Sequence, residues 1–60
     1  MRLKIQELHN KYGITYKRIA ENIEISLPYM SRWIRGEREF SEKTYKRITE
    51  FYNNFINRGL

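Results

Sequence analysis

The chain has 60 residues, of which 12 are Lys or Arg and 7 are Asp or Glu, so its formal net charge is +5. The lack of cysteine excludes a disulfide scaffold and a thiolate zinc site, and the single histidine, His9, has no partner ligand at metal spacing. Because the sequence contains neither a membrane-length apolar run nor a secretion signal, we expect a cytoplasmic chain that needs no metal or cofactor.

The size and charge of the chain limit both its architecture and its partners. A chain of this length forms at most one domain, here residues 1–60, and buries only about 60% of the surface that its unfolded form exposes. The basic excess is spread over both halves of the sequence, so we expect it on a folded surface. An acidic partner is therefore expected, with nucleic acid ahead of an anionic membrane or an acidic protein.

The first group of apolar residues at helical spacing lies near the amino end of the sequence. Apolar residues at positions 5, 8 and 12 predict a first helix from Arg2 to about Lys11, followed by Gly13 in a left-handed conformation. His9 is expected on the surface of this helix. A short second helix is predicted after Thr15, whose side chain can cap the free N–H groups of the first turn.

The segment ISLPYMSRWIRG, residues 25–36, predicts a third helix. Ser26 is the expected cap, and Pro28 lies in the first turn, where its missing N–H breaks no helical hydrogen bond. Gly36 ends the helix at about residue 35. Residues at helical spacing form its inward face, and we assign Ile25, Met30 and Trp33 to the core together with Ile19 and Ala20 of the second helix.

The fourth predicted helix follows the cap candidate Ser41 and is the longest. Its apolar residues repeat every three or four positions through Tyr45, Ile48, Phe51 or Tyr52, and Phe55. The pair at positions 53 and 54, both asparagine, either continues this helix or breaks it before a short fifth turn. No strand pattern is present, so the expected fold class is all-α with four to five short helices.

Two short helices about three residues apart, the second rich in arginine, are typical of a helix-turn-helix, although spacing alone is weak support. The residues themselves are more specific, because positions 13 to 50 resemble the Cro/C1 repressor (XRE) family, typified by lambda-type repressors. The resemblance implies a lambda-repressor-like bundle with its helix-turn-helix core at about residues 15–35. The residues that carry it are Thr15, Ile19, Ala20, Ile25, Ser26, Tyr29, Met30, Ser31, Arg32, Trp33, Arg35, Gly36, Arg38, Ser41, Thr44 and Ile48.

In this family the first residues of the third helix face base edges, which implies Leu27, Pro28, Ser31 and Arg32 here. Arg32 is the best candidate for direct readout, because a guanidinium can donate twice to guanine, worth about 1–3 kcal/mol of discrimination. The alternative is an ordinary surface arginine. Leu27 and Pro28 have no side-chain donor, so they could only contact a thymine methyl group or fit the groove by shape. Ser31 could bind a base or a phosphate.

The resemblance also implies contacts to phosphates from the start of the second helix and from the far flank of the third. The implied residues are Thr15, Tyr16, Tyr29, Arg35, Arg38 and Lys43. For Arg35 and Arg38 the alternative is a solvated helix end, where they stabilise the helix dipole or pair with Glu37 or Glu39. Tyr29 is equally suited to packing under the turn.

Two positions depart from the family pattern. Glu24 occupies the turn position that usually holds glycine, so either it is left-handed at some energetic cost or the turn differs. Ile34 stands where relatives often carry a charge. With other apolar residues it suggests a surface larger than the monomer can bury, and hence a homodimer interface. The predicted interface residues are Ile34, Phe40, Phe51, Phe55 and Ile56.

These observations predict a sequence-specific regulator that binds double-stranded DNA. The form most consistent with the resemblance is a small phage or mobile-element repressor of Cro type, whose dimer would bind a pseudo-palindromic operator with half-sites about 34 Å apart. The alternative is a protein-interaction module on the same fold, such as an antitoxin-like or host-takeover protein. We expect no enzyme and no small-molecule ligand, because no nucleophile and base or carboxylate pair has suitable spacing. Membrane binding is not expected either, because the apolar helix faces are used for the core.

Overall fold

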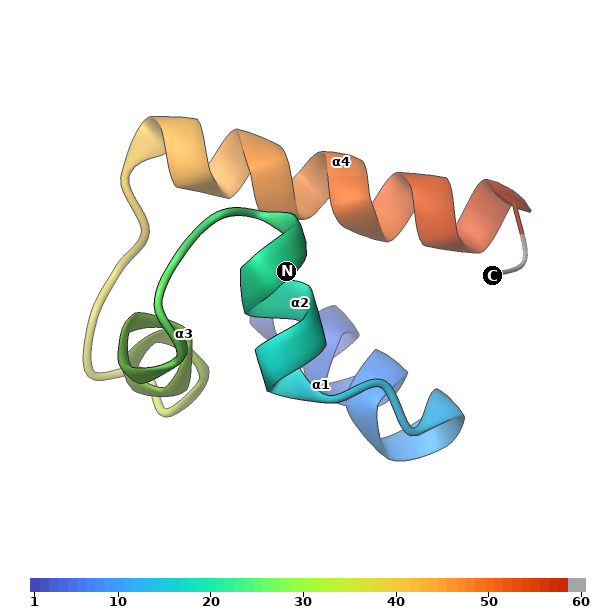
Figure 1. Ribbon diagram of the computed structural model, residues 1–60, viewed down its shortest axis with the longest axis horizontal. Coiled ribbons are helices and arrows are strands. Elements are labelled where there is room, and N and C mark those ends of the chain that lie inside the picture. The colour runs from blue at the N-terminus through green and yellow to red at the C-terminus, as the bar shows by residue number, and fades with distance from the viewer. Residues whose placement is uncertain (59–60) are drawn as a thin grey trace.

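The computed structural model describes residues 1–58, which form four α-helices and no strand. The all-α fold predicted from the sequence is therefore confirmed. In Figure 1, α4 extends along one side of the molecule, and α3, seen nearly end-on, runs across its direction. None of the described helices is both long and apolar enough to span a membrane. The helices are α1 (Arg2–Tyr12), α2 (Tyr16–Asn22), α3 (Leu27–Ile34) and α4 (Glu42–Arg58).

The local signals for helix ends act as predicted. Each cap hydroxyl accepts a hydrogen bond from a backbone N–H in the first turn of its helix, which satisfies a group that has no helical partner. The three bonds are Thr15 from Arg18 (3.1 Å), Ser26 from Tyr29 (3.3 Å) and Ser41 from Thr44 (3.2 Å). Gly13 and Gly36 both have positive φ, 71° and 77°, and they stop α1 and α3 where predicted.

The α4 helix continues through the two asparagines, and no break separates them from the residues that follow. Phe55, one position beyond them, is only 7% exposed and packs into the core. Burial of a large side chain in this turn contributes about 1.5–3 kcal/mol, which outweighs the weak helix propensity of two asparagines. The alternative of a short fifth turn is thus not found within residues 1–58. The predicted domain's last two residues, 59 and 60, lie outside the described part.

The core lies between the four helices and is built mainly from aliphatic residues around one indole ring. Trp33 is 2% exposed and stacks on Phe40, with ring centroids 4.2 Å apart and an angle of 10° between the planes. Ile25, assigned to the core from the sequence, is only partly buried against it. The buried apolar residues are Ile5, Leu8, Ile14, Ile19, Ala20, Ile23, Met30, Trp33, Ile48 and Phe55.

The turn between α2 and α3 contains a left-handed non-glycine residue. Glu24 has φ 62°, so it adopts the left-handed conformation, one of the two alternatives for this position. The turn is closed by a hydrogen bond from the Ile25 N–H to the Ala20 carbonyl at 3.0 Å. Arg47 of α4 also supports it, since its guanidinium donates to the Ile23 carbonyl at 3.4 Å and lies 3.7 Å from the Glu24 carboxylate.

Replacement of Glu24 by glycine is expected to stabilise the protein. Relief of the left-handed strain exceeds the added entropy of the unfolded chain, so the free energy of unfolding should rise by about 0.5–1 kcal/mol and Tm by about 2–8 °C. Thermal denaturation followed by circular dichroism measures the change. Glu24→Ala is the matched control, because it removes the same carboxylate and keeps the Cβ atom. Equal shifts in the two variants would show that the backbone at this turn is not strained.

Candidate nucleic-acid interface

The two faces of α3 have different roles. Met30 is fully buried and Trp33 nearly so, which fixes the inward face of the helix. The predicted base-contact residues are three and four positions apart on the other side, where helical geometry places them together. Three of them are exposed and the serine is partly buried. What they contact stays a prediction. This outer face consists of Leu27, Pro28, Ser31 and Arg32.

The start of α2 is built around a stacked pair of rings. Tyr16 lies against His9 of α1, with ring centroids 4.2 Å apart. Nδ1 of His9 is 2.7 Å from the Ile14 carbonyl, and because a carbonyl only accepts, Nδ1 carries the proton. His9, expected on the surface of the first helix, is half-buried there and held by Tyr16 and the Ile14 carbonyl.

Two hydroxyls at this end of α2 remain able to donate. The Tyr16 phenol carries its proton at neutral pH, as tyrosines ordinarily do, and burial raises its pKa further. The Thr15 hydroxyl accepts from Arg18 and still has its own hydrogen to give. Both properties suit a phosphate oxygen, which only accepts hydrogen bonds. The predicted phosphate role of these two residues is compatible with the geometry and stays a prediction.

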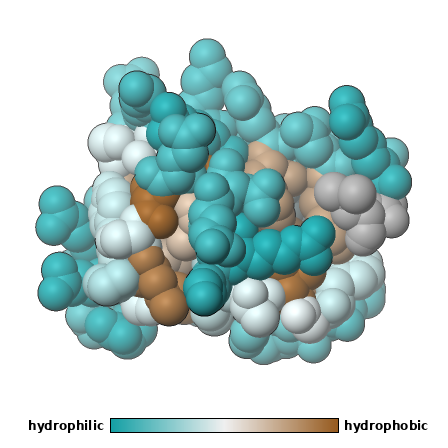
Figure 2. Space-filling view, viewed as in Figure 1, coloured by the Kyte–Doolittle hydropathy of each residue, from teal (hydrophilic) through white to brown (hydrophobic). Residues whose placement is uncertain are grey.

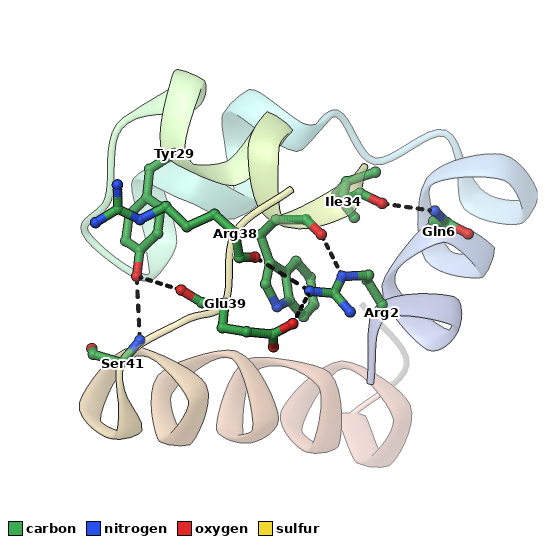
Figure 3. A network of polar contacts seen from close by, with 8 residues as sticks. Arg2, Gln6, Tyr29, Ile34, Arg38, Glu39 and Ser41 are labelled. Carbon is green, nitrogen blue, oxygen red and sulfur yellow. Dashed lines mark hydrogen bonds and ion pairs between the residues drawn. The ribbon is translucent and has the colours of Figure 1, made fainter. Parts of the chain in front are cut away.

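Tyr29 packs under the loop that leads to α4. Its hydroxyl donates to the Glu39 carbonyl at 3.4 Å and accepts from the Ser41 N–H at 3.2 Å (Figure 3). Its ring lies edge-on to Phe40, with centroids 5.2 Å apart. The structure thus supplies the packing role that was weighed against a phosphate contact. A phosphate would have to displace the Glu39 carbonyl to receive this hydroxyl hydrogen.

Arg35 forms an ion pair at the carboxyl end of α3. Its guanidinium donates to both carboxylate oxygens of Glu37, at 2.8 and 3.3 Å. The hydrogen bond and the charge of Glu37 raise the pKa of Arg35, and the same hydrogen bond lowers the pKa of Glu37, helped by the charges of Arg35 and Arg32. Arg35 therefore adopts the pairing that was its alternative to a phosphate contact. A phosphate would have to compete with Glu37 for it.

Three other basic residues that were predicted to contact DNA are more available than Arg35. Arg32, Arg38 and Lys43 are exposed, and none forms an ion pair within residues 1–58. The Arg38 guanidinium lies 5.1 Å from the centroid of the Tyr29 ring, which holds it beside α3 (Figure 3). A phosphate or a base could therefore engage Arg32 on α3, Arg38 beside it, or Lys43 in the first turn of α4 without first breaking an ion pair.

The predicted dimer surface needs a correction. Phe55 is buried in the core of one chain, and Phe40 is half-buried against Trp33, so neither belongs to a free apolar surface. Ile34 and Phe51 are also partly covered, whereas Ile56 is 51% exposed. Figure 2 shows that hydrophilic side chains interrupt the hydrophobic areas on the face in view. The apolar repeat of α4 was predicted correctly, but its buried residue Phe55 is covered by the same chain, where it packs against Tyr12 of α1.

Two α1 residues that the sequence did not single out touch the end of α3. Arg2 donates to the Trp33 carbonyl, and Gln6 donates to the Ile34 carbonyl at 3.4 Å. No local pattern could have marked these contacts, because 31 and 28 residues separate the partners.

Residues 5–54 match the model of a family described as helix-turn-helix. The matched region begins within α1, includes α2 and α3 entirely, and ends within α4. Comparisons with curated proteins and with solved structures give no significant match.

Neutralising Glu37 is expected to strengthen binding to double-stranded DNA. Glu37→Gln frees Arg35 from its ion pair and removes a negative charge close to Arg32, so affinity at low salt should rise about threefold for any duplex sequence. Fluorescence anisotropy with a labelled duplex measures this. Glu50→Gln on α4 makes the same change in net charge at an exposed residue without an ion pair among residues 1–58. An equal gain in both variants would contradict a local role for Glu37.

Proposed function

The chain belongs to the Cro/C1-type helix-turn-helix family (XRE family), a family of DNA-binding transcription regulators, and we propose that it binds double-stranded DNA sequence-specifically through α3. In this proposal α3 is the recognition helix and enters the major groove, whose width admits an α-helix. Arg32 reads a guanine, while Leu27 and Pro28 contact thymine methyl groups or fit the groove by shape.

The observation that carries the proposal is that α3 has two different faces. One face is buried, and the other is exposed and carries the cation Arg32. Met30 and Trp33 hold the inner face, and Arg32 is exposed on the outer face without an ion pair among residues 1–58. Arg38 and Lys43 flank it and supply the phosphate contacts that set the register of the helix on the duplex. Thr15 and Tyr16 add hydroxyl donors on the opposite flank.

We further propose that two copies bind one operator and repress transcription by excluding polymerase, as a small Cro-type regulator of a phage or mobile element. A two-fold dimer would place two α3 helices about 34 Å apart, which requires a pseudo-palindromic site. Ile56 is the exposed member of the predicted interface residues and the best candidate for the contact between copies.

Selection of bound sequences from a random duplex pool tests readout and symmetry together. We expect enrichment of a motif with two inverted half-sites whose centres are about 10 base pairs apart. An asymmetric single half-site would support readout by α3 and contradict the dimer. No enrichment, together with no binding to random duplex at low salt, would favour a protein-interaction module on this fold.

Two arginine substitutions separate base readout from phosphate contact. Arg32→Ala is expected to weaken binding to the selected sequence by about 1–3 kcal/mol and to leave binding to random duplex much less affected. Arg38→Ala should weaken both alike and reduce the slope of log affinity against log salt by about one. Anisotropy titrations at several salt concentrations measure both quantities. Equal losses on the two duplexes for Arg32→Ala would remove its role as reader.

A further inference from the structure

The first turn of α1 lies against the carboxyl end of α3 and holds it through side chains. The Arg2 guanidinium donates through Nε to the Trp33 carbonyl and through Nη2 to the Arg38 carbonyl at 3.3 Å. The same Nη2 lies 3.0 Å from the Glu39 carboxylate. Gln6, one turn further along α1, donates to the Ile34 carbonyl at 3.4 Å (Figure 3). Arg2 thus joins α1, the end of α3 and the loop before α4.

These contacts complete the hydrogen bonding at the end of α3. The last carbonyls of a helix have no partner within it, and all four from residues 31–34 are satisfied here. Backbone N–H groups of the following turn bind three of them: Arg35 to Ser31, Glu37 to Arg32, and Gly36 to Trp33. The Gln6 side chain is the donor to the fourth, and Arg2 adds a second donor to the Trp33 carbonyl.

The Arg2 side chain is directed inward, although it is basic and close to Arg38. Its guanidinium lies 5.2 Å from the centroid of the Trp33 ring, and its side chain is 31% exposed. A planar fork can bind a helix carbonyl, a loop carbonyl and a carboxylate at once, which a lysine ammonium on a flexible stem does poorly. A cation at this end of α3 also stabilises the helix dipole.

We propose that Arg2 is a positioning residue for α3, which fixes the direction of the helix against α1 and thereby the placement of Arg32. The effect on DNA rests on the function proposed above. Arg2 itself does not contact DNA in this proposal, because Nε and Nη2, which carry three of its five N–H donors, are used within the chain. Gln6 assists by holding the neighbouring carbonyl.

The DNA test compares selectivity, defined as affinity for the selected sequence divided by affinity for random duplex. Arg2→Lys keeps the charge and loses the fork, and it should lower selectivity about tenfold without changing the salt slope. Arg2→Met loses both the fork and the charge, and it should also lower selectivity about tenfold without changing the salt slope. Lys4→Met is the matched control, because Lys4 is a cation of the same turn of α1 that lies over another ring, Tyr52. It should leave selectivity unchanged.

Each result of this comparison decides the role of Arg2. Unchanged selectivity in Arg2→Lys would overturn the proposal. A salt slope reduced by about one in Arg2→Met, with selectivity kept, would show that Arg2 is a phosphate contact instead. Glu39→Gln should have little effect, because Glu39 is 82% exposed and the backbone acceptors of Arg2 remain. A loss of selectivity equal to that of Arg2→Met would place the role in the ion pair rather than in the hold on α3.

A second measurement needs no DNA and so keeps this inference separate from the proposed function. Hydrogen exchange at the amides of Arg35, Gly36 and Glu37 reports opening at the end of α3. In Arg2→Lys these three amides should exchange about tenfold faster, whereas Ile48 in the core of α4 and the whole Lys4→Met variant should not change. Unchanged rates at the three amides would overturn the inference. Equal acceleration at Ile48 would reduce Arg2 to a general contribution to stability.

Discussion

The burial of Trp33 is the constraint on which the arrangement of the candidate interface depends. Its ring stacks on Phe40, its outer side carries the Arg2 guanidinium, and its carbonyl accepts both from Arg2 and from the Gly36 N–H. One residue therefore joins α3 to α1 and to the loop before α4. With this side held, rotation of α3 about its own axis would expose the indole, so Arg32 can point only outward.

The formal charge of +5 overstates the charge that is ready to meet a phosphate. Three arginines are engaged by the fold: Arg2 at the end of α3, Arg35 with Glu37, and Arg47 at the turn before α3. The exposed pairs contribute little to stability, since solvent screens them. Their main consequence is in placement, because they separate cations that organise the chain from cations such as Arg32 that are free to bind.

Features that depend on neighbouring residues in the sequence could be predicted, whereas contacts between distant residues could not. The caps at Thr15 and Ser26 and the left-handed Gly36 follow from the chemistry of single residues and their neighbours, so helix bounds could be predicted to within about a residue or two. The inner and outer faces of α3 follow from its period. Which neighbour covers an apolar stripe does not follow from the period. Phe55 was for that reason assigned to a dimer surface, although it is buried within the chain and packs against Tyr12 of α1.

The contacts that hold the candidate site together join distant residues, such as Arg2 with Trp33 and Tyr29 with Ser41. Their importance follows from the composition of the outer face of α3. Leu27 and Pro28 offer no hydrogen-bond donor, so in the proposed complex Arg32 supplies most of the directional readout. A bidentate contact tolerates little displacement, because both of its donors must reach their acceptors together. A recognition helix that relies on one such residue therefore needs its axis fixed at both ends. The hydrogen bond from the Ile25 N–H to the Ala20 carbonyl before its start and Arg2 at its end supply that restraint.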